Sequence, residues 1–324
     1  MPRSIISVAR LGTPWETIDP FLVCAYHLDH YPPGNADLGP VEPPPADTGA
    51  GKPWRMYFGQ TVPGFPAHPH RGFETITIVR QGVVDHSDSL GATARYGAGD
   101  VQWLTAGRGV VHAEMFPLLD PLEPNTLELF QIWLNLPARD KMAEPSFKMF
   151  WAEDIPRHVE AGVDVTCIVG ALHGVHMQQP PSPPSRSWAS DPSSDLAVWT
   201  LKMAPGARWQ LPPALGSGTR RQLLFFKGST LTIDGECVDA RSAIEVDCSA
   251  VVELVNGSKE AEVLLLQGRS IEEPVVQHGP FVMTTLDEIR RAYEDYRHTR
   301  FGDWAWGVYD PNHGSKRGRF ASTD

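Results

Sequence analysis

The stretch Gly64-Phe65-Pro66-Ala67-His68-Pro69-His70-Arg71-Gly72-Phe73-Glu74, followed by Thr75-Ile76-Thr77-Ile78-Val79, is the most informative part of the sequence. Its second part is rich in β-branched residues and is typical of a strand. Side chains two apart on a strand share a face, so His68 and His70 project together. The same holds for His112 and Glu114, which end the segment Thr105–Glu114. The sequence therefore predicts two strands that each carry a pair of metal-ligand types.

Short apolar runs like this one recur along the chain, and Gly, Pro, Asn or Asp separate them. The others cover residues 127–136, 163–169, 196–203, 223–226, 251–255 and 263–267. This pattern predicts an all-β sandwich or barrel rather than alternating strands and helices. Gln81–Asp85 and Lys227–Leu231 each follow an apolar strand and contain a glycine turn. From this likeness between the halves we expect a duplicated β-barrel.

A chain of 324 residues is long enough for two domains. The polar segment Pro137–Lys141 follows a clear strand and is the best candidate for a linker. We therefore expect one domain over residues 1–140, a second over 141–284, and a helix and tail over 285–324. Thr285-Leu286-Asp287-Glu288 has the pattern of a capping box, which starts the helix. The last residues are expected to fray, and the Pro-rich stretches 40–53 and 179–195 to form exposed loops.

Composition excludes several classes of function. The formal net charge of −11 argues against direct nucleic-acid binding, which needs a basic face. No run of about 18 apolar residues is present, so we expect no membrane segment. The N-terminus lacks the apolar core of a secretory signal, and the cysteines, Cys24, Cys167, Cys237 and Cys248, form no CxxC pair. We expect buried free thiols in a monomeric, cytoplasmic protein, which in a eukaryote would also be nuclear.

The two ligand pairs point to a transition metal. Neutral imidazole and carboxylate suit Fe, Ni, Mn, Co, Cu or Zn, and neither motif contains the sulfur ligands of most structural zinc sites. His68, His70, His112 and Glu114 would leave coordination positions open for substrate or O₂. Glu74 is an alternative carboxylate ligand, because it lies in phase with the first pair. It could instead hold a ligand imidazole through its other ring nitrogen. The competing interpretation is that these residues lie on strands without binding anything.

Aromatic and apolar side chains flank both pairs. Phe65 and Phe73 lie beside the first, and Trp103 and Met115 beside the second. A pocket made of such side chains suits a flat aromatic ligand, although ordinary barrel packing explains each of them equally well. His86 follows a turn, and we expect it to be exposed.

Five segments together resemble one protein family. They are HPHRGFET (68–75), GDVQWLTAGRGVVHAEM (99–115), LFQIWLNLP (129–137), KMAEP (141–145) and QHGPFVM (277–283). They closely resemble the pirin family of the cupin superfamily, over about residues 19–296. The resemblance implies two cupin, jelly-roll-type barrels with metal only in the first. It also implies one Fe held by His68, His70, His112 and Glu114, with Glu74 outside the ligand set. Arg208–Pro212 stands where a second His pair would fall, so we expect no second metal.

The resemblance implies two competing functions. Several members are described as quercetin 2,3-dioxygenases, in which the metal would bind the enol oxygen of a flavonol and O₂ would add to the ring. Glu114 would take the substrate's proton if it releases the metal. Other members are described as iron-dependent transcription cofactors or as modulators of metabolic enzymes, which implies a protein partner instead. The sequence alone does not decide between them.

Overall fold

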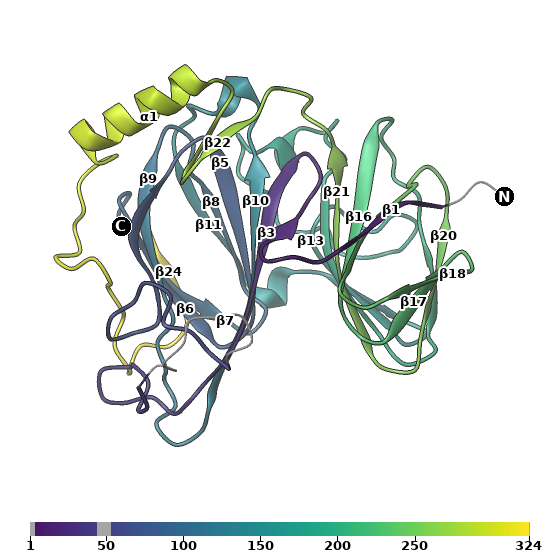
Figure 1. The fold of residues 1–324 in the computed structure, drawn as a ribbon, viewed down its shortest axis with the longest axis horizontal. Coiled ribbons are helices and arrows are strands. Elements are labelled where there is room, and N and C mark those ends of the chain that lie inside the picture. The colour runs from purple at the N-terminus through teal and green to yellow at the C-terminus, as the bar shows by residue number, and fades with distance from the viewer. Residues whose placement is uncertain (1–3, 44–52, 324) are drawn as a thin grey trace. The chain divides into compact units, whose positions relative to one another are not determined.

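The computed structural model describes residues 4–43 and 53–323, and it is built mainly from β-strands with one α-helix in that part of the chain (Figure 1). The predicted all-β fold with a C-terminal helix is confirmed. The chain divides into two compact units, each assembled from two segments. The N-terminal barrel comprises residues 26–152 and 273–323, and the C-terminal barrel comprises 153–272 and the described residues up to Ala25. The expected division placed residues 1–140 in the first domain. In the structure the first strands, up to Ala25, belong to the C-terminal barrel, and residues 273–323 belong to the N-terminal barrel.

The N-terminal unit contains two large sheets and one two-stranded sheet. Its strands are β3 (Phe21–Tyr31), β4 (Gly64–His70), β5 (Phe73–Gln81), β6 (Val83–Asp88), β7 (Thr93–Gly97), β8 (Val101–Thr105), β9 (Val110–Met115), β10 (Asn125–Asn135), β11 (Ser146–Phe150), β22 (Val276–His278), β23 (Phe281–Met283) and β24 (Phe320–Ser322). One large sheet has the order β24-β7-β6-β9-β4, the other has the order β11-β8-β5-β10-β3, and β22 pairs with β23. The first half of β3 belongs to the other unit, where it pairs with β2 (Trp15–Glu16).

Strand β5 shows why this sequence forms a barrel wall. The residues from Phe73 to Val79 are all buried, and Thr75, Ile76, Thr77 and Ile78 are β-branched, which favours a pleated strand packed on both faces. Pairing with β8 and β10 fixes its register. The apolar core of the barrel includes Tyr31, Val79, Val84, Tyr96, Phe116, Leu127 and Leu129.

The C-terminal barrel is also a two-sheet structure. Its strands are β1 (Ile5–Arg10), β2, β12 (Arg157–Glu160), β13 (Val163–Val169), β14 (Ala197–Met203), β15 (Arg208–Leu211), β16 (Thr219–Lys227), β17 (Thr230–Ile233), β18 (Glu236–Asp239), β19 (Ser242–Val246), β20 (Val252–Asn256) and β21 (Ala261–Arg269). The orders are β1-β19-β16-β21-β14-β13-β12 and β15-β20-β17-β18. Trp209 and Leu211 of β15 pack in one apolar core with side chains from both sheets. The side chains of Trp209 and Leu211 therefore point into the barrel, at the positions where a second pair of histidines would have to point to bind a metal.

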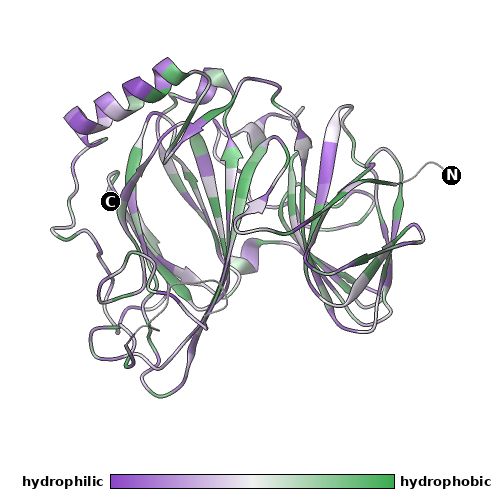
Figure 2. Cartoon of the chain, in the orientation of Figure 1, coloured by the Kyte–Doolittle hydropathy of each residue, from purple (hydrophilic) through white to green (hydrophobic). Residues whose placement is uncertain are grey.

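Helix α1 (Leu286–Thr299) begins at the predicted capping box. The Thr285 hydroxyl accepts from the Glu288 amide at 3.2 Å, and the Glu288 carboxylate accepts from the Thr285 amide at 2.9 Å. The helix packs Ile289 and Ala292 against β23 and is otherwise largely hydrophilic, as Figure 2 shows. Within the described residues, no helix combines the length and apolarity needed to cross a membrane.

The tail after helix α1 is attached to the N-terminal barrel, which differs from the fraying we expected. Its last strand, β24, pairs with β7. Earlier in the tail, Tyr309 accepts a backbone hydrogen bond from Ala67 of β4 at 2.7 Å. Arg95, buried in β7, donates to the carbonyl oxygens of Gly314 and Arg317 while pairing with Asp85. The tail therefore covers hydrogen-bonding groups at both edges of the sheet that holds β9.

Several other expectations can be compared with the structure. The segment expected as a linker contains a 3₁₀-helix, Ala138–Asp140, and the buried Lys141, whose ammonium group donates to Gly72, Asn135 and Val282. Most of the first Pro-rich stretch lies outside the described residues. The second contains a 3₁₀-helix, Trp188–Ser190, that buries an indole ring. Another 3₁₀-helix covers Ala152–Asp154. All four thiols are free, but Cys237 is exposed rather than buried.

Candidate metal centre

Three imidazoles meet where β4 and β9 pair. His68 lies directly opposite His112 in the antiparallel register, and His70 lies two residues further along β4. One nitrogen from each of the three rings can be chosen so that all lie within 4.8 Å of one another. The ring centroids are 4.4 Å apart for His68 and His112 and 4.9 Å apart for His70 and His112. The strand phase read from the sequence places His68 and His70 on one face, and the pairing of β4 with β9 brings His112 to them.

A β-bulge in β4 orients the first imidazole. Phe65 pairs with Glu114 and His68 pairs with His112, so three residue steps on β4 match two steps on β9. Bulges of this kind redirect side chains next to functional sites. The carbonyl of Pro66, inside the bulge, lies 2.9 Å from Nδ1 of His68 and accepts its proton. This hydrogen bond leaves Nε2 of His68 with its lone pair for a ligand.

The other two imidazoles differ in their partners. His70 Nδ1 lies 3.4 Å from the carbonyl oxygen of Pro280, in the turn between β22 and β23. His112 is fully buried, yet neither of its ring nitrogens has a hydrogen-bond partner. Burial lowers the pKa of His68 to about 4 and lowers the pKa of His70 and His112 well below the usual value. All three rings are therefore neutral near pH 7, which is the form that binds metals.

Glu114 stands beside the imidazoles on the same face of β9. Its Oε2 lies 4.0 Å from Nε2 of His112 and accepts a hydrogen bond from Gln131 Nε2 at 2.6 Å. Its Oε1 accepts from the Thr77 hydroxyl at 3.3 Å. Burial raises the pKa of this carboxyl group, and the two hydrogen bonds oppose the rise only in part. A buried, oriented carboxyl group next to neutral imidazoles can bind a cation or exchange a proton.

Glu74 and Trp103 lie on a different face from the imidazoles. The chain turns between β4 and β5 at Gly72, whose φ is +84°, so the strand phase does not carry over from the first histidine pair. On β5 the side chain of Thr77 reaches Glu114, and Glu74 is three residues away, on the opposite face. Glu74 instead accepts hydrogen bonds from the indole of Trp103 at 3.0 Å and from the hydroxyl of Thr105 at 2.7 Å.

The remaining flanking residues fall into two groups. Phe65 and Phe73 lie near the imidazoles, with ring centroids 6.2 Å from His68 and 5.0 Å from His70, respectively. Met115 does not, because it follows Glu114 directly on β9 and so points to the opposite face. It packs with Leu38 and Val62 in a separate apolar cluster.

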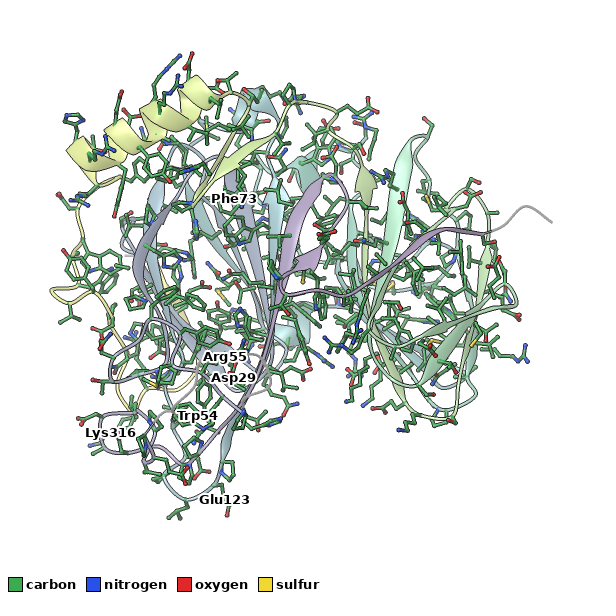
Figure 3. The ribbon with its side chains drawn as sticks, in the orientation of Figure 1. Asp29, Trp54, Arg55, Phe73, Glu123 and Lys316 are labelled. Atoms are coloured by element: carbon green, nitrogen blue, oxygen red, sulfur yellow. The ribbon has the colours of Figure 1, made fainter. Side chains whose placement is uncertain are left out.

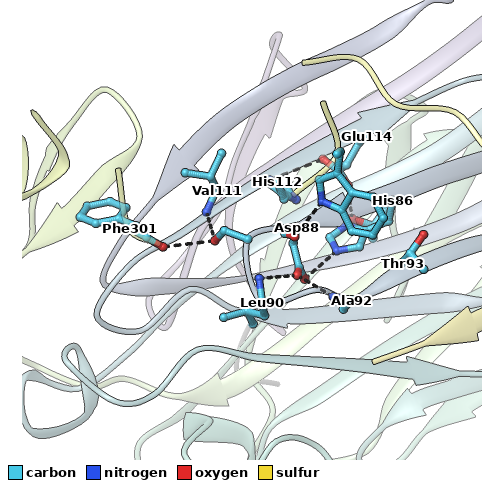
Figure 4. Close-up of polar contacts among 12 residues, drawn as sticks. His86, Asp88, Leu90, Ala92, Thr93, Val111, His112, Glu114 and Phe301 are labelled. Atoms are coloured by element: carbon cyan, nitrogen blue, oxygen red, sulfur yellow. Dashed lines mark hydrogen bonds and ion pairs between the residues drawn. The ribbon is translucent and has the colours of Figure 1, made fainter. Parts of the chain in front are cut away.

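Sequence reasoning missed three polar neighbours of the site. Gln131 and Thr77 hold Glu114, and a polar residue inside the apolar run Leu129–Leu134 was an available signal for the first of them. His86 is fully buried rather than exposed, and its Nε2 lies 2.9 Å from Asp88 (Figure 4). Its position follows from β6 pairing with β9, where His86 opposes Glu114. That long-range pairing is not visible in the local sequence.

Comparisons with known proteins agree with this architecture. A family model described as pirin matches residues 46–134, and a second, described as the pirin C-terminal cupin domain, matches residues 198–302. The chain is 34% identical to a Pseudomonas aeruginosa protein named "Putative quercetin 2,3-dioxygenase", over 92% of this chain and 91% of that one. It is 35% identical to human pirin, over 74% of this chain and 78% of that one. A crystal structure of quercetin 2,3-dioxygenase from Acinetobacter baumannii superposes with a TM-score of 0.73 at 25% identity, covering 93% of this chain and 98% of that one.

Proposed function

This chain belongs to the pirin family of two-barrel cupin proteins, and from that premise we propose that it is a metal-dependent dioxygenase acting on flavonols. The proposed site is the candidate centre of the N-terminal barrel, with His68, His70, His112 and Glu114 as ligands of one divalent ion. Iron is the metal that the family resemblance implies, and Ni, Mn, Co, Cu or Zn are substitutes with similar ligand preferences. The proposed substrates are a flavonol such as quercetin and O₂.

The observation that carries the proposal is the state of His112. A buried imidazole whose two nitrogens lack hydrogen-bond partners is unfavourable, because the polar atoms have lost water without replacement. A cation among the three rings would satisfy one of these nitrogens. The donor set also fits, since neutral imidazoles and a carboxylate bind first-row divalent metals. The carbonyl behind His68 orients that ring as a supporting hydrogen bond does in known metal sites.

The bound metal would supply the acidity that flavonol oxidation needs, by lowering the pKa of an oxygen acid held on it. The protein's own part is proton handling and orientation. Glu114 is oriented by Gln131 and Thr77, and its carboxylate becomes available as a base when it releases the metal. An oxygen of Glu114 is therefore proposed to accept the proton of the substrate hydroxyl.

The surroundings of His70 would limit access of water. Phe73 and Trp133 pack their rings 4.2 Å apart, and both lie against this imidazole, at 5.0 and 5.4 Å. Apolar rings next to a charged centre strengthen electrostatic interactions inside it because they exclude solvent.

The experiment that tests the proposal is anaerobic reconstitution with Fe(II), followed by admission of O₂ and measurement of quercetin consumption and CO release. We expect about one metal ion per chain and turnover that depends on it. His68→Ala and His112→Ala are expected to lose the metal while remaining folded, as judged by circular dichroism. Two ions per chain, or full metal content in His68→Ala, would contradict the ligand set. Protein shown to be loaded with Fe, Ni, Mn, Co or Cu that never consumes the flavonol would favour the regulatory alternative.

A further inference from the structure

Phe65 occupies the same face of β4 as the metal-ligand candidates because the bulge shifts its phase. It pairs across the sheet with Glu114, and residues that oppose each other in a sheet share a face. Its ring is surrounded by other aromatic rings at centroid distances of 4.9 to 6.2 Å: Tyr57, Phe58, His27, Phe116 and His68. Phe65 therefore joins the imidazoles to an aromatic cluster outside the ligand set.

Phe58 is the exposed member of this cluster. Its side chain is 72% exposed although its ring centroid lies only 5.8 Å from that of Phe65. The turn that carries it is fixed, because the amides of Phe58 and Gly59 both donate to the carbonyl of Gly64 at 3.1 Å. A side chain at position 59 would collide with the carbonyl oxygen of Val62, 1.9 Å from an added Cβ. The protein thus holds an apolar ring in solvent on an ordered turn.

The residue before Phe58 is anchored by a buried polar network. Tyr57 has a φ of +56°, a backbone conformation that is unfavourable for a bulky residue and persists only where the surroundings impose it. Its hydroxyl donates to Asp29 at 2.6 Å and lies 2.6 Å from Nδ1 of His27. Arg55 pairs with the same carboxylate, and Figure 3 shows these two side chains together. The network holds the exposed ring of Phe58 beside Phe65.

We propose that Phe58 and Phe65 form an aromatic wall on which a ring of the ligand stacks as it enters the metal centre. This inference rests on the proposed function and adds the residues that would select an aromatic ligand over other planar enols. The two rings are inclined by 58°. A flat ligand ring stacked on one of them would therefore meet the other at a steep angle. Both arrangements are favourable between aromatic rings at centroid distances of about 4.5–7 Å.

The test compares Phe58→Ala with the natural protein in metal-loaded form under anaerobic conditions. Two probes are titrated: quercetin, followed by its absorbance, and acetylacetone, a planar enol without an aromatic ring. We expect quercetin to bind about 5- to 10-fold more weakly, which corresponds to the loss of one aromatic pair. Acetylacetone affinity, metal content and the unfolding midpoint should not change, and Phe58→Tyr should restore quercetin binding.

Leu122→Ala is the matched control, because Leu122 is another largely exposed apolar residue of the same barrel, at 82% against 72% for Phe58, and lies outside the aromatic cluster. Unchanged quercetin affinity in Phe58→Ala, no quercetin binding to the natural protein, or an equal loss for both probes would overturn the inference. Admission of O₂ then separates it from the proposed function. Phe58-dependent binding without consumption leaves the wall intact and refutes the dioxygenase. Consumption of quercetin with an affinity that does not depend on Phe58 refutes the aromatic wall and leaves the dioxygenase standing.

Discussion

Exchanging Glu114 and Glu74, one at a time, for the amide should separate metal binding from folding. Glu114→Gln removes the negative charge 4.0 Å from His112, while the side chain stays close in size and can still meet Gln131. If Glu114 is a direct ligand, metal affinity should fall by more than about 100-fold, or about 2.7 kcal/mol, which exceeds the usual cost of losing an outer partner. The metal-free variant should be as stable as the natural protein or more so. The pKa of Glu114 is raised in the folded protein, so its ionised carboxylate destabilises the folded state at pH values above the usual pKa of a glutamate.

Glu74→Gln should show the opposite behaviour. Its carboxylate accepts from Trp103 and Thr105 on the other face of β5, and a charged acceptor gains about 1 kcal/mol more per hydrogen bond than a neutral one. We therefore expect the free energy of unfolding to fall by about 2 kcal/mol, with metal affinity reduced by no more than about 10- to 100-fold. Chelator competition measures the affinities, and urea unfolding of the metal-free proteins measures the stabilities. A larger loss of affinity in Glu74→Gln than in Glu114→Gln would refute the assignment of the two carboxylates.

Three further changes test buried ionisable side chains of the same barrel. Burial, aided by the charge of Arg55, lowers the pKa of His27 to about 4, so protons bind the unfolded chain more readily below pH 6.5. Stability should then fall by about 2 kcal/mol between pH 7 and pH 5 on account of this group, and urea titrations of His27→Asn should show that much less dependence on pH. Arg95→Met leaves the buried Asp85 without its ion pair and should lower the free energy of unfolding by about 3–5 kcal/mol, measured by thermal unfolding. Adding Asp85→Leu should recover part of this loss. If it does not, the loss comes from the broken contacts between Arg95 and the tail instead. Lys141→Met removes the donor to three oxygens and should lower the free energy of unfolding by about 2–3 kcal/mol, measured by calorimetry. Unchanged stability would show that water replaces the ammonium group.

Local periodicity was enough to predict the strands and to place His68 and His70 on one face of β4, whereas the approach of His112 depends on the pairing of β4 with β9. Side chains alternate between the two faces of any extended strand, so His70 could be placed beside His68 without knowledge of the fold. The capping box of α1 was equally local. Predictions failed where the phase was interrupted. Glu74 was expected in phase with the first pair, but the turn at Gly72 begins a new strand with its own phase.

The remaining features depend on which strands become neighbours, and the local sequence does not contain that information. His86 looked like a surface residue after a turn, yet β6 pairs with β9 and places it opposite Glu114 inside the barrel. Gln131 reaches the site from β10, and the carbonyl of Pro280 from a turn more than two hundred residues away from His70 in the sequence. The last residues were expected to fray because chain termini are often poorly ordered. Buried Arg95 nevertheless gives carbonyl groups of the tail a partner.

The positions of the apolar core and the imidazoles explain why the barrel can fold without metal. The apolar side chains around Val79, Tyr96 and Leu129 pack with one another, so this core requires no bound metal. His112→Ala even removes two buried nitrogens that lack partners, which offsets part of the lost contact area. A metal that binds only the folded barrel then adds stability that grows with its free concentration above the dissociation constant. We therefore expect added metal to raise the unfolding temperature of the natural protein and to leave that of His112→Ala unchanged. A metal-dependent rise in the variant would mean that the ion binds elsewhere.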